Sequence, residues 1–560
     1  MAVNNGVPPA ASYGHPCPWD MGFAPVPLPQ LLIESVRRTP DARACDFMGR
    51  PTSYAAMLGL AERFAAGLQA HGIAKGDRVG LYLPNVPIYI AAYYGAMLAG
   101  ATVVNFSPLY TATELSHQVA DSGTRLLVTL DVPALLPTAL EVLGASALET
   151  LVVGSLAAQL PSVKGWALRL LKRRDLAAVP ARADVIAFDA FLRAGPPAPV
   201  DIDPEADIAL LQYTGGTTGT PKGAMLTHAN LAANARQVDA IDPFGADGDI
   251  IMAVLPFFHV FANTCVLNRT IAKGGCIAML PRFDAGQTLK AIGRVKPTAF
   301  PGVPTMYQAL LDHPAIGSTD FSSLRVCVSG GAGLPAPVRE KFEAVSSARL
   351  VEGYGLTESS GVVSVNPYEG RRKPGTIGQV LPQTRVQLRD KEDANRPAPE
   401  GEPGELVVAG PQIMRGYWNR PESDADAFVM IDGERWLRTG DIATIDEDGF
   451  IAIVDRSKDM IAVGGFKVFP SQVEAVLVEH PSVKEALVIG VPDDYRGEVP
   501  RAFVVRQADD DTAPEAIEQW LNARLGKHER VFGLTLRDSL PKTMIGKLDR
   551  KALREEVLGG

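Results

Sequence analysis

The sequence predicts an α/β protein in two parts: a large multi-layer N-terminal domain of β-sheets flanked by helices, and a small α+β C-terminal domain. Apolar, β-rich runs alternate with helical patterns through most of the chain, as expected for mostly parallel strands joined by helices. With 560 residues, 46% of them hydrophobic, the chain also exceeds what one compact core usually spans. After about residue 455 the alternation changes to a shorter α/β unit.

Apolar runs mark the strands of the large domain, at residues 78–83, 126–129, 208–213, 250–255, 276–280 and 324–329. Residues 79–113 contain no charged residue, a feature shared with membrane spans. Pro84, Pro87 and Pro108 interrupt this stretch, so we expect a buried helix at 88–98 and a buried strand at 101–106 instead. Residues 390–404 are polar and Pro-rich, which predicts an exposed loop between strands.

The predicted boundaries divide the chain into a flexible N-terminal tail at 1–25, the large domain at 26–455, a hinge at 456–458 and the small domain at 459–560. Strands are expected in the small domain at 460–463, 485–491, 501–506 and 534–537. Helices are expected at 471–480 and 514–525.

Composition excludes several classes of protein. The formal net charge of −9 gives no global attraction for a polyanion, so nucleic acid is not an expected partner. The five cysteines lie far apart without a CxxC pair, which indicates reduced thiols in a cytoplasmic protein. No Lys or Arg precedes Arg37 and no continuous apolar segment follows the start, so a secretory signal is not expected.

A Gly-rich segment, YTGGTTGTPKG at residues 213–223, follows the strand predicted at 208–213. Its glycines allow a tight turn with exposed N–H groups, while its threonine hydroxyls and Lys222 add donors and a positive charge that suit a polyphosphate. Pro221 stands where the Walker A pattern needs glycine, which disfavours a P-loop NTPase. Taken alone, the segment also fits an ordinary Gly-rich hairpin.

A second segment, GYGLTE at residues 353–358, strengthens the nucleotide interpretation. Tyr354 offers an aromatic face for a purine and Thr357 a hydroxyl. Glu358 offers a hard oxygen ligand for Mg²⁺, although a solvated loop acid is the simpler alternative for that residue alone.

Three further motifs follow in order: RTGD at 438–441, VDRSKDMI at 454–461 and PKTMIGK at 541–547. Together the five motifs resemble the signatures of the adenylate-forming (ANL) superfamily, which includes acyl-CoA synthetases, firefly luciferase and peptide-synthetase adenylation domains. The resemblance covers residues 27–553. It implies a reaction in which a carboxylic acid is first joined to AMP from ATP and the acyl group is then passed to coenzyme A. It also implies that the small C-terminal domain is mobile.

The resemblance implies roles around Mg·ATP for matching residues. Those that would wrap the pyrophosphate end are Thr214, Gly215, Gly216, Thr217, Thr218, Gly219 and Lys222. Those that would frame the adenine are Gly331, Ala332, Glu352, Gly353 and Tyr354. Tyr354 would stack on the base, Thr357 would touch the α-phosphate, and Thr214 and Glu358 would hold Mg²⁺.

Further roles implied by the resemblance belong to the C-terminal motifs. Asp441 would accept hydrogen bonds from the ribose, and Arg456 would support the same sugar. Lys547 would bridge the α-phosphate and the incoming carboxylate, which makes Lys547, Thr214 and Glu358 the expected catalytic residues. A C-terminal lysine within the basic cluster 547–551 would otherwise be read as solvated.

After adenylation, the resemblance implies rotation of the small domain about Lys458. That motion would withdraw Lys547 and present Gly464, Gly465 and Phe466 to the pantetheine of CoA.

His259, in LPFFHVFAN at residues 255–263, matches a histidine that lines the carboxylate end of the acyl pocket in this family. On generic grounds an aromatic-flanked His is more often a packing residue. We expect His259 to position the substrate rather than to act as acid or base. Asn263 stands where some long-chain members have a tryptophan, so a tryptophan-gated tunnel is not expected.

The acid is predicted from closer resemblance. HPCPWD near the start, NFSPLYTATEL at 105–115 and LPSVKGWALRLLKRR at 160–174 resemble bacterial long-chain fatty-acid–CoA ligases. Residues 160–174 form a basic amphipathic element that suits peripheral contact with an anionic membrane. A surface helix packed on the protein is the alternative interpretation.

Other readings stay open. They include ligases for medium-chain, dicarboxylic or aryl acids, and a ligase that stops at acyl-AMP or passes the acyl group to a carrier protein. A non-catalytic nucleotide or fatty-acid binder is disfavoured because it needs no Lys547, and luciferase activity is also disfavoured. PKTMIGK resembles a site of reversible lysine acetylation, so an acetyltransferase and a deacetylase acting on Lys547 are expected partners. The oligomeric state is open, a homodimer included.

Overall fold

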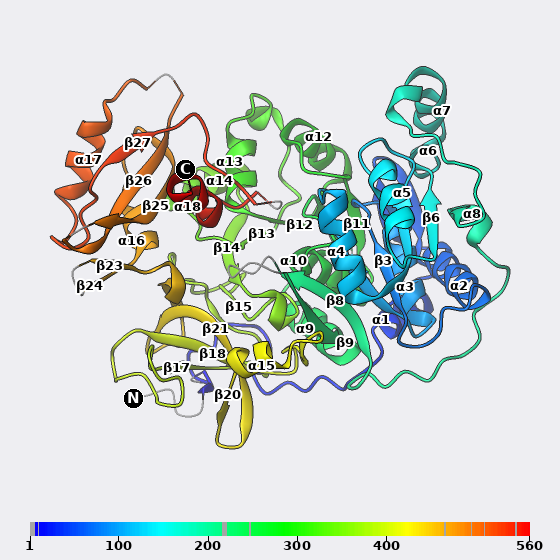
Figure 1. Cartoon of the computed structure of the whole chain (residues 1–560), viewed down its shortest axis with the longest axis horizontal. Helices are drawn as coiled ribbons and strands as arrows, with labels where there is room; N and C mark the ends of the chain where they lie inside the picture. Colours follow the sequence, from blue (N-terminus) through cyan, green and yellow to red (C-terminus); the bar gives the residue numbers. More distant parts are fainter. Residues whose placement is uncertain are drawn as a thin grey trace.

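The computed structural model describes residues 6–8, 10–214, 221–245, 248–463, 466–493, 495–508, 510–543 and 546–559. Two sheets rich in parallel strands, a third antiparallel sheet and a small C-terminal domain follow one another along the chain (Figure 1). The predicted α/β architecture is confirmed.

The β8 sheet takes its name from the strand that enters the Gly-rich segment. Strands from β8 to β7 in its order run parallel, and β9 and β19 extend it as an antiparallel edge. Its order is β19 (Gly416–Tyr417), β9 (Lys222–Thr227), β8 (Ile208–Thr214), β4 (Thr102–Asn105), β3 (Arg78–Leu81), β5 (Thr124–Leu130), β6 (Thr150–Gly154) and β7 (Val185–Ala187).

The β13 sheet is the second layer, with a parallel centre and antiparallel strands at both edges. Its order is β16 (Gln379–Val380), β15 (Ser364–Val365), β14 (Arg349–Tyr354), β13 (Val326–Gly330), β12 (Ala299–Gly302), β10 (Ile250–Ala253), β11 (Cys276–Met279), β1 (Arg43–Phe47) and β2 (Arg50–Ser53).

The third sheet is antiparallel throughout and departs from the expectation of mostly parallel strands. Its members are β17 (Arg385–Arg389), β18 (Gly404–Ala409), β21 (Glu434–Ile445), β20 (Phe428–Ile431) and β22 (Ile451–Arg456). Strands β20 and β21 are joined by a short connection and pair as a hairpin, as do β21 and β22, whereas β19, α15 (Pro421–Ala427) and β20 lie in the chain between the neighbours β18 and β21. The loop predicted at 390–404 does join two of its strands, β17 and β18.

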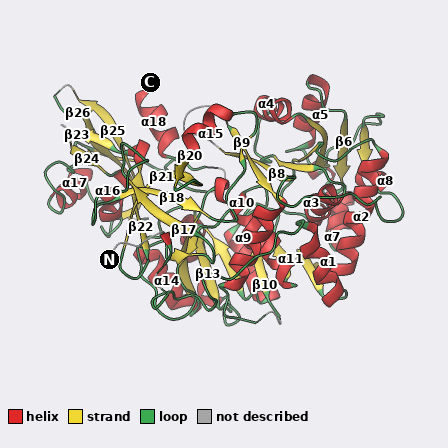
Figure 2. Cartoon of the chain, turned by 90° about the horizontal axis from the view of Figure 1, so that it is seen from below, coloured by secondary structure: helices red, strands yellow, loops and turns green. Residues whose placement is uncertain are grey.

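Helices cover the sheets (Figure 2). In the large domain they are α1 (Pro29–Arg38), α2 (Tyr54–Ala70), α3 (Pro87–Leu98), α4 (Ala112–Ser122), α5 (Leu136–Ala145), α6 (Leu156–Gln159), α7 (Ser162–Leu171), α8 (Phe188–Phe191), α9 (His228–Ala240), α10 (Val260–Ala262), the π-helix η3 (Asn263–Asn268), α11 (Arg269–Lys273), α12 (Ala285–Val295), α13 (Pro304–Leu311), α14 (Ala336–Ser346) and α15 (Pro421–Ala427).

Local sequence explains the element boundaries nearest the site. Pro87 starts α3, whose side chains are buried from Pro87 to Met97, which accounts for the uncharged stretch without a membrane. Thr227 ends β9 and caps α9: its Oγ1 accepts from the Asn230 N–H at 3.2 Å, and the Asn230 side chain accepts from the Thr227 N–H at 3.0 Å. Within the described ranges, no helix has the length and apolarity to cross a bilayer.

The small domain has hydrophobic clusters of its own, formed by residues that all follow Asp459. Its elements are β23 (Ile461–Val463), β24 (Phe466–Val468), α16 (Pro470–Leu477), β25 (Val483–Asp493), β26 (Gly497–Arg506), α17 (Pro514–Asn522), β27 (Leu534–Leu536) and α18 (Arg550–Leu558). Polar contacts with the large domain include the Lys484–Asp312 ion pair at 2.7 Å and the Thr305 hydroxyl donating to the Gly546 carbonyl at 2.8 Å.

Side chains of the predicted N-terminal tail contact the rest of the large domain over residues 13–19. The Tyr13 hydroxyl donates to the Val380 carbonyl at 3.1 Å, and Trp19 Nε1 donates to the Thr384 carbonyl at 2.9 Å. His15 is buried against the Gln379 carbonyl. Tyr13 and His15 thus contact β16, the edge strand of the β13 sheet, and Trp19 contacts the segment between β16 and β17.

Candidate active site

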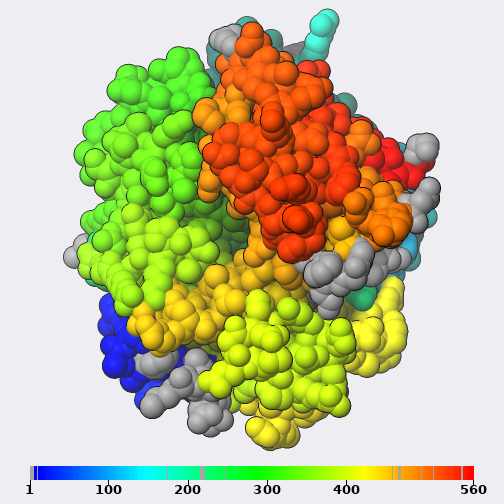
Figure 3. Space-filling model, turned by 90° about the vertical axis from the view of Figure 1, so that its left-hand side faces the viewer, coloured from blue at the N-terminus to red at the C-terminus, as the bar shows by residue number. Residues whose placement is uncertain are grey.

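A cavity of about 1810 Å³ lies where the large and small domains meet. Figure 3 shows the small domain, orange to red, against the green part of the large domain. Predicted site residues that line the cavity are Thr214, Lys222, His259, Gly331, Ala332, Glu352, Gly353, Tyr354, Thr357, Glu358, Arg456, Lys458 and Lys547. The carboxyl ends of parallel strands β8, β13 and β14 contribute to its wall, which is the usual place for a ligand in such sheets.

The Gly-rich segment connects β8 to β9 as a hairpin in which Thr214 pairs with Lys222. Gly215, Gly216, Thr217, Thr218 and Gly219 lie outside the described residues. The Lys222 ammonium lies 5.3 Å from the centre of the Tyr417 ring, a distance at which the ring face attracts the cation.

Tyr417 is a site residue that sequence reasoning missed. Its hydroxyl donates to Glu358 Oε1 at 2.6 Å, so one ring contacts both Lys222 and the predicted magnesium ligand. Strand β19 places it there by pairing Tyr417 with Ala224 of β9. The signal in the sequence was an aromatic residue directly after a glycine, Gly416. The structure shows why glycine stands there: its φ is +154°, and a Cβ atom would lie close to Asp424.

The donor set fits a magnesium ion brought in with a nucleotide. Mg²⁺ usually takes one or two carboxylates together with substrate phosphates and water. Glu358 and the Thr214 hydroxyl face the same cavity, and the described residues include no cluster of three His, Cys, Asp or Glu side chains that would cage a metal.

The predicted adenine residues converge at the ends of β13 and β14. Gly330 and Gly353 are paired neighbours across these strands, and Gly331 and Ala332 follow directly. Glu352 accepts a hydrogen bond from the Leu334 N–H at 2.9 Å, and burial raises its pKa to about 7. Thr357 opens the short helix η5 (Thr357–Ser359), which also carries Glu358.

Tyr354, Asp441 and Arg456 form one network. The Tyr354 hydroxyl donates to Asp441, and Arg456 Nε donates to the other Asp441 oxygen at 3.0 Å. The register of β21 and β22 causes this, because Asp441 lies opposite Arg456. Asp441 is 2% exposed, and its partners Tyr354 and Arg456 line the cavity; its contact with a ribose stays a prediction. Lys458 follows in η6 (Ser457–Asp459).

Lys547 reaches the cavity from the small domain and passes over Gly331. A Cβ atom at residue 331 would lie 2.1 Å from Lys547 Cε and 2.6 Å from Nζ, and the φ of Gly331 is +84°. The positive φ favours glycine at 331, and a Cβ atom there would displace the end of the Lys547 side chain. Burial, and after it the charge of Arg456, lowers the pKa of Lys547 to about 8.

His259 lines the cavity and caps α10, where its Nδ1 accepts from the Phe261 N–H at 3.3 Å. Burial, with a smaller contribution from the Lys547 charge, lowers the pKa of His259 to about 3, so its ring is neutral. A neutral ring with Nδ1 used as an acceptor keeps its proton on Nε2, which suits a donor to a substrate oxygen.

Asn263 faces away from the cavity. Its Oδ1 accepts from the Tyr93 hydroxyl at 2.8 Å and from Asn268 Nδ2 at 2.9 Å, and it is fully buried. Cys265, two residues further along η3, lines the cavity instead. Gly464 and Gly465 lie outside the described residues, as does the side chain of Phe466, the first residue of β24.

Comparison with protein-family models matches residues 32–418 to the AMP-binding enzyme family and residues 472–547 to the AMP-binding enzyme C-terminal domain.

Individual relatives extend over nearly the whole chain. A long-chain-fatty-acid–CoA ligase of Bacillus subtilis (strain 168) is 40% identical over 551 residues, covering 98% of this chain and 97% of the relative. A long-chain-fatty-acid–CoA ligase of Escherichia coli O6:H1 is 38% identical over 542 residues, covering 95% of each. The crystal structure of the anthranilate CoA ligase AuaEII with anthranoyl-AMP superposes with a TM-score of 0.83 at 26% identity, covering 95% of this chain and 97% of the other.

Proposed function

The chain belongs to the AMP-binding enzyme family, and from this premise we propose that it is an ATP-dependent fatty acyl-CoA synthetase, an acid–thiol ligase that converts a long-chain fatty acid, ATP and CoA into acyl-CoA, AMP and diphosphate. One observation carries the proposal. Lys547 of the small domain enters the same cavity that Lys222, Glu358 and His259 of the large domain line. A protein that only binds nucleotide or fatty acid does not require a lysine from a second domain in its site.

In the first half-reaction the acid's carboxylate oxygen attacks the α-phosphorus of ATP, forming the acyl–O–AMP bond and breaking the bond to diphosphate. Lys547 holds the α-phosphate and the carboxylate together and offsets the negative charge that grows on the phosphate oxygens. The neutral His259 ring donates from Nε2 to orient the acid without taking its proton.

The remaining residues bind the nucleotide. Lys222 and the Gly-rich segment would hold the β- and γ-phosphates, and Thr214 and Glu358 would hold Mg²⁺, with Tyr417 fixing the Glu358 carboxylate. When bound, the ion would neutralise charge on the diphosphate. Gly331, Ala332, Glu352, Gly353 and Tyr354 enclose the adenine.

In the second half-reaction the CoA thiol replaces AMP on the acyl carbon after the small domain rotates about residues 456–458. The domain boundaries at 26–455 and 459–560 belong to this proposal, as do Gly464, Gly465 and Phe466 as the contact for pantetheine. Its own hydrophobic clusters allow the small domain to move as a unit.

A long-chain acid is favoured by the named activity of the most similar relatives and by an apolar arm of the cavity, lined by residues such as Val238, Ile251 and Val328. An aryl acid is the second candidate, since a ligase for an aryl acid shares the fold.

The protein acts in the cytoplasm with peripheral contact to anionic membranes through α7, in this proposal. Trp166 is 64% and Leu171 78% exposed, with Lys164, Arg169 and Lys172 also exposed beside them. The helix lies at the opposite end of the molecule from the small domain (Figure 1), so binding there leaves domain rotation free. Reversible acetylation of Lys547 would remove its charge and stop adenylation, and a homodimer is compatible with this scheme.

Acid-dependent exchange of labelled pyrophosphate into ATP, run with saturated, dicarboxylic and aryl acids, tests the activity. We expect exchange with long saturated acids and CoA-dependent release of AMP. Lys547→Ala should lower exchange about a hundredfold or more, whereas Lys527→Ala, an exposed lysine away from the cavity, should leave it unchanged. If none of the acids supports exchange, or if Lys547→Ala exchanges at the wild-type rate, the proposal is contradicted.

A further inference from the structure

The cavity has a deep arm that ends at charged residues. Its walls are mainly apolar and come from α9, the β13 sheet and η3, through Val238, Ile251, Cys265, Ala299, Val326 and Tyr368. The lining also includes two charged residues that come about one helical turn after apolar ones: Arg269, the first residue of α11, follows Cys265, and Asp242, just past α9, follows Val238. A buried charge is costly unless it is paired, so Arg269 and Asp242 should belong to a set of ion pairs.

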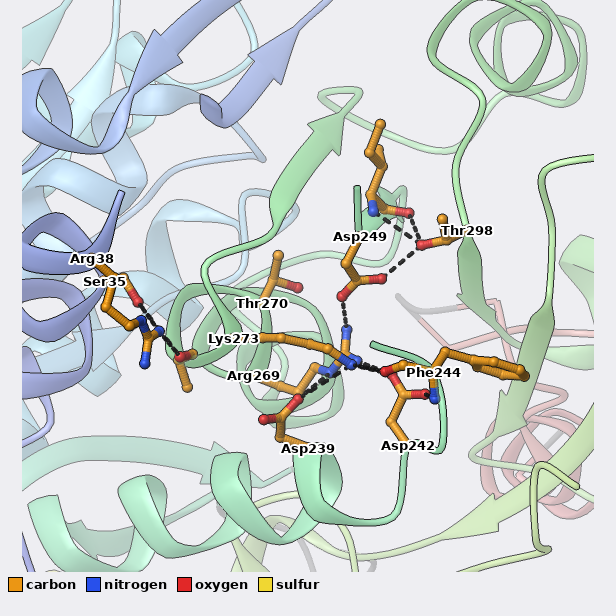
Figure 4. Close-up of polar contacts among 12 residues, drawn as sticks. Ser35, Arg38, Asp239, Asp242, Phe244, Asp249, Arg269, Thr270, Lys273 and Thr298 are labelled. Atoms are coloured by element: carbon orange, nitrogen blue, oxygen red, sulfur yellow. Dashed lines mark hydrogen bonds and ion pairs between the residues drawn. The ribbon is translucent and has the colours of Figure 1, made fainter. Parts of the chain in front are cut away.

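Arg269 and Asp242 belong to a buried cluster that we call the ion floor, made of Arg269, Lys273, Asp239, Asp242 and Asp249 (Figure 4). Arg269 donates through one terminal nitrogen to Asp249 at 2.5 Å and through the other to Asp242, while its Nε lies 3.5 Å from Asp239. The Arg269 side chain is 6% exposed. All three nitrogens of the guanidinium therefore face carboxylates.

The carboxylates of the ion floor have further partners. Lys273 Nζ donates to Asp242 at 2.6 Å and to the Phe244 carbonyl at 2.9 Å, and the Thr298 hydroxyl donates to Asp249 at 2.7 Å. Figure 4 shows these side chains converging from α9 and α11 and from the strand ends beside Asp249 and Thr298. Burial opposes the charge of Arg269, but Asp249, Asp239 and Asp242 outweigh it and hold its pKa above the ordinary value.

We propose that the ion floor is the end-stop of the acyl site and sets the maximum length of fatty acid that the enzyme activates. This inference rests on the proposed function. Each methylene group that moves from water into the arm favours binding about fourfold. Advancing past the ion floor would instead break a buried ion pair, which disfavours binding a few hundredfold or more. Affinity therefore rises with chain length until the terminal methyl meets Arg269 and then falls.

The ion floor also selects for an apolar end. A substrate carboxylate at the far end would need a cation, but Arg269 and Lys273 already face three carboxylates of the protein. We expect a dicarboxylic acid of a given length to be activated at least about a hundredfold less well than the monocarboxylic acid.

The test measures kcat/KM for acyl-adenylate formation with even-numbered saturated acids, in the full-length enzyme and in Arg269→Ala/Asp249→Asn. This double variant removes one charge of each sign and leaves Lys273 to neutralise Asp242. Two acids are compared: the longest acid that wild type accepts, and the next longer acid in the series. The readout is kcat/KM for the longer acid divided by kcat/KM for the shorter one. We expect this ratio to rise about tenfold or more, because further methylenes enter the space that Arg269 vacates.

Arg294→Ala/Asp46→Asn is the matched control. It removes the same two residue types from a 2.7 Å ion pair whose members do not line the cavity, and it should leave the ratio unchanged. Arg269→Lys keeps the charge on a shorter side chain. It should raise the ratio less than the double variant does. If the double variant does not fold, the Arg269→Lys result tests the proposal in its place.

An unchanged ratio in folded Arg269 variants would overturn the end-stop, as would preferential activation of dicarboxylic acids by wild type. If the proposed function itself is wrong, the result is different: none of the fatty acids would then cause wild type to release pyrophosphate.

Discussion

At the scale of single residues, the site depends on a close approach between a backbone and a side chain from different domains. Gly331 leaves the space through which Lys547 reaches the cavity, and its positive φ also excludes other residue types. A substitution at 331 would therefore strain the backbone and also displace a lysine more than 200 positions away in the chain.

Gly331→Ala should lower acyl-adenylate formation about a hundredfold, because the added methyl group displaces Lys547 by an ångström or more. Gly333→Ala is the control: no atom lies within 4 Å of a Cβ at 333, so its rate should equal that of wild type. Pyrophosphate exchange measures both. Equal rates for the two variants would show that Lys547 does not act from this position.

The lowered pKa of Lys547 predicts a limit at alkaline pH. The ammonium form is present below a pKa of about 8 and is lost as the pH rises through it, so kcat/KM for ATP should fall above pH 8. In Lys547→Arg the guanidinium stays charged, so the alkaline fall should disappear even if the rate is lower. If kcat/KM of the arginine variant falls with the same midpoint pH, the fall is caused by a group other than Lys547.

At the scale of elements, α7 is positioned by a glycine and left uncovered on its apolar side. A Cβ at Gly165 would lie 2.3 Å from the Ala157 carbonyl oxygen, so this glycine lets α7 cross close to α6. The contact orients the helix while leaving Trp166, Leu170 and Leu171 exposed. A helix packed on the protein would bury these side chains, which favours the membrane interpretation.

Trp166→Ser/Leu171→Ser should lower partition onto anionic vesicles at least about tenfold, because two large apolar side chains no longer enter the lipid interface. Val345→Ser/Met430→Ser removes exposed apolar side chains elsewhere and should have no effect. Sedimentation with vesicles of varied anionic content is the measurement. Binding that is independent of lipid charge would contradict the prediction.

At the scale of the whole molecule, the two domains have separate hydrophobic clusters, and residues of both line the cavity. The Lys484–Asp312 pair at their boundary is partly exposed, and such pairs add about 1 kcal/mol at most. The domains should therefore unfold as distinct cooperative units.

Calorimetry should resolve two transitions, the smaller with an enthalpy of about 70 kcal/mol for a domain of roughly 100 residues. Mg·ATP should raise both midpoints, because residues from both domains line its cavity. One transition that stays single in the presence and absence of nucleotide would indicate one folding unit.

Sequence reasoning located strands such as β8, β10 and β11 because each is a largely buried apolar run. Lys222, Tyr354, Thr357 and Glu358 were suggested by the chemistry of their side chains, whereas most other site residues were assigned through the resemblance of the five motifs to the adenylate-forming superfamily. Tyr417 was missed because its role depends on strand pairing between β19 and β9, which is not local in sequence. Pairing also determines that Asp441 faces Arg456, and tertiary packing of α9 against α11 determines the ion floor.

The volume between the domains has a consequence for hydration. A space of about 1810 Å³ holds several dozen water molecules when no substrate is bound. An acyl chain and a nucleotide that fill it must release most of them, so substrate binding should carry a large negative heat capacity change. The same dehydration protects a mixed anhydride, which water would otherwise cleave before the thiol arrives.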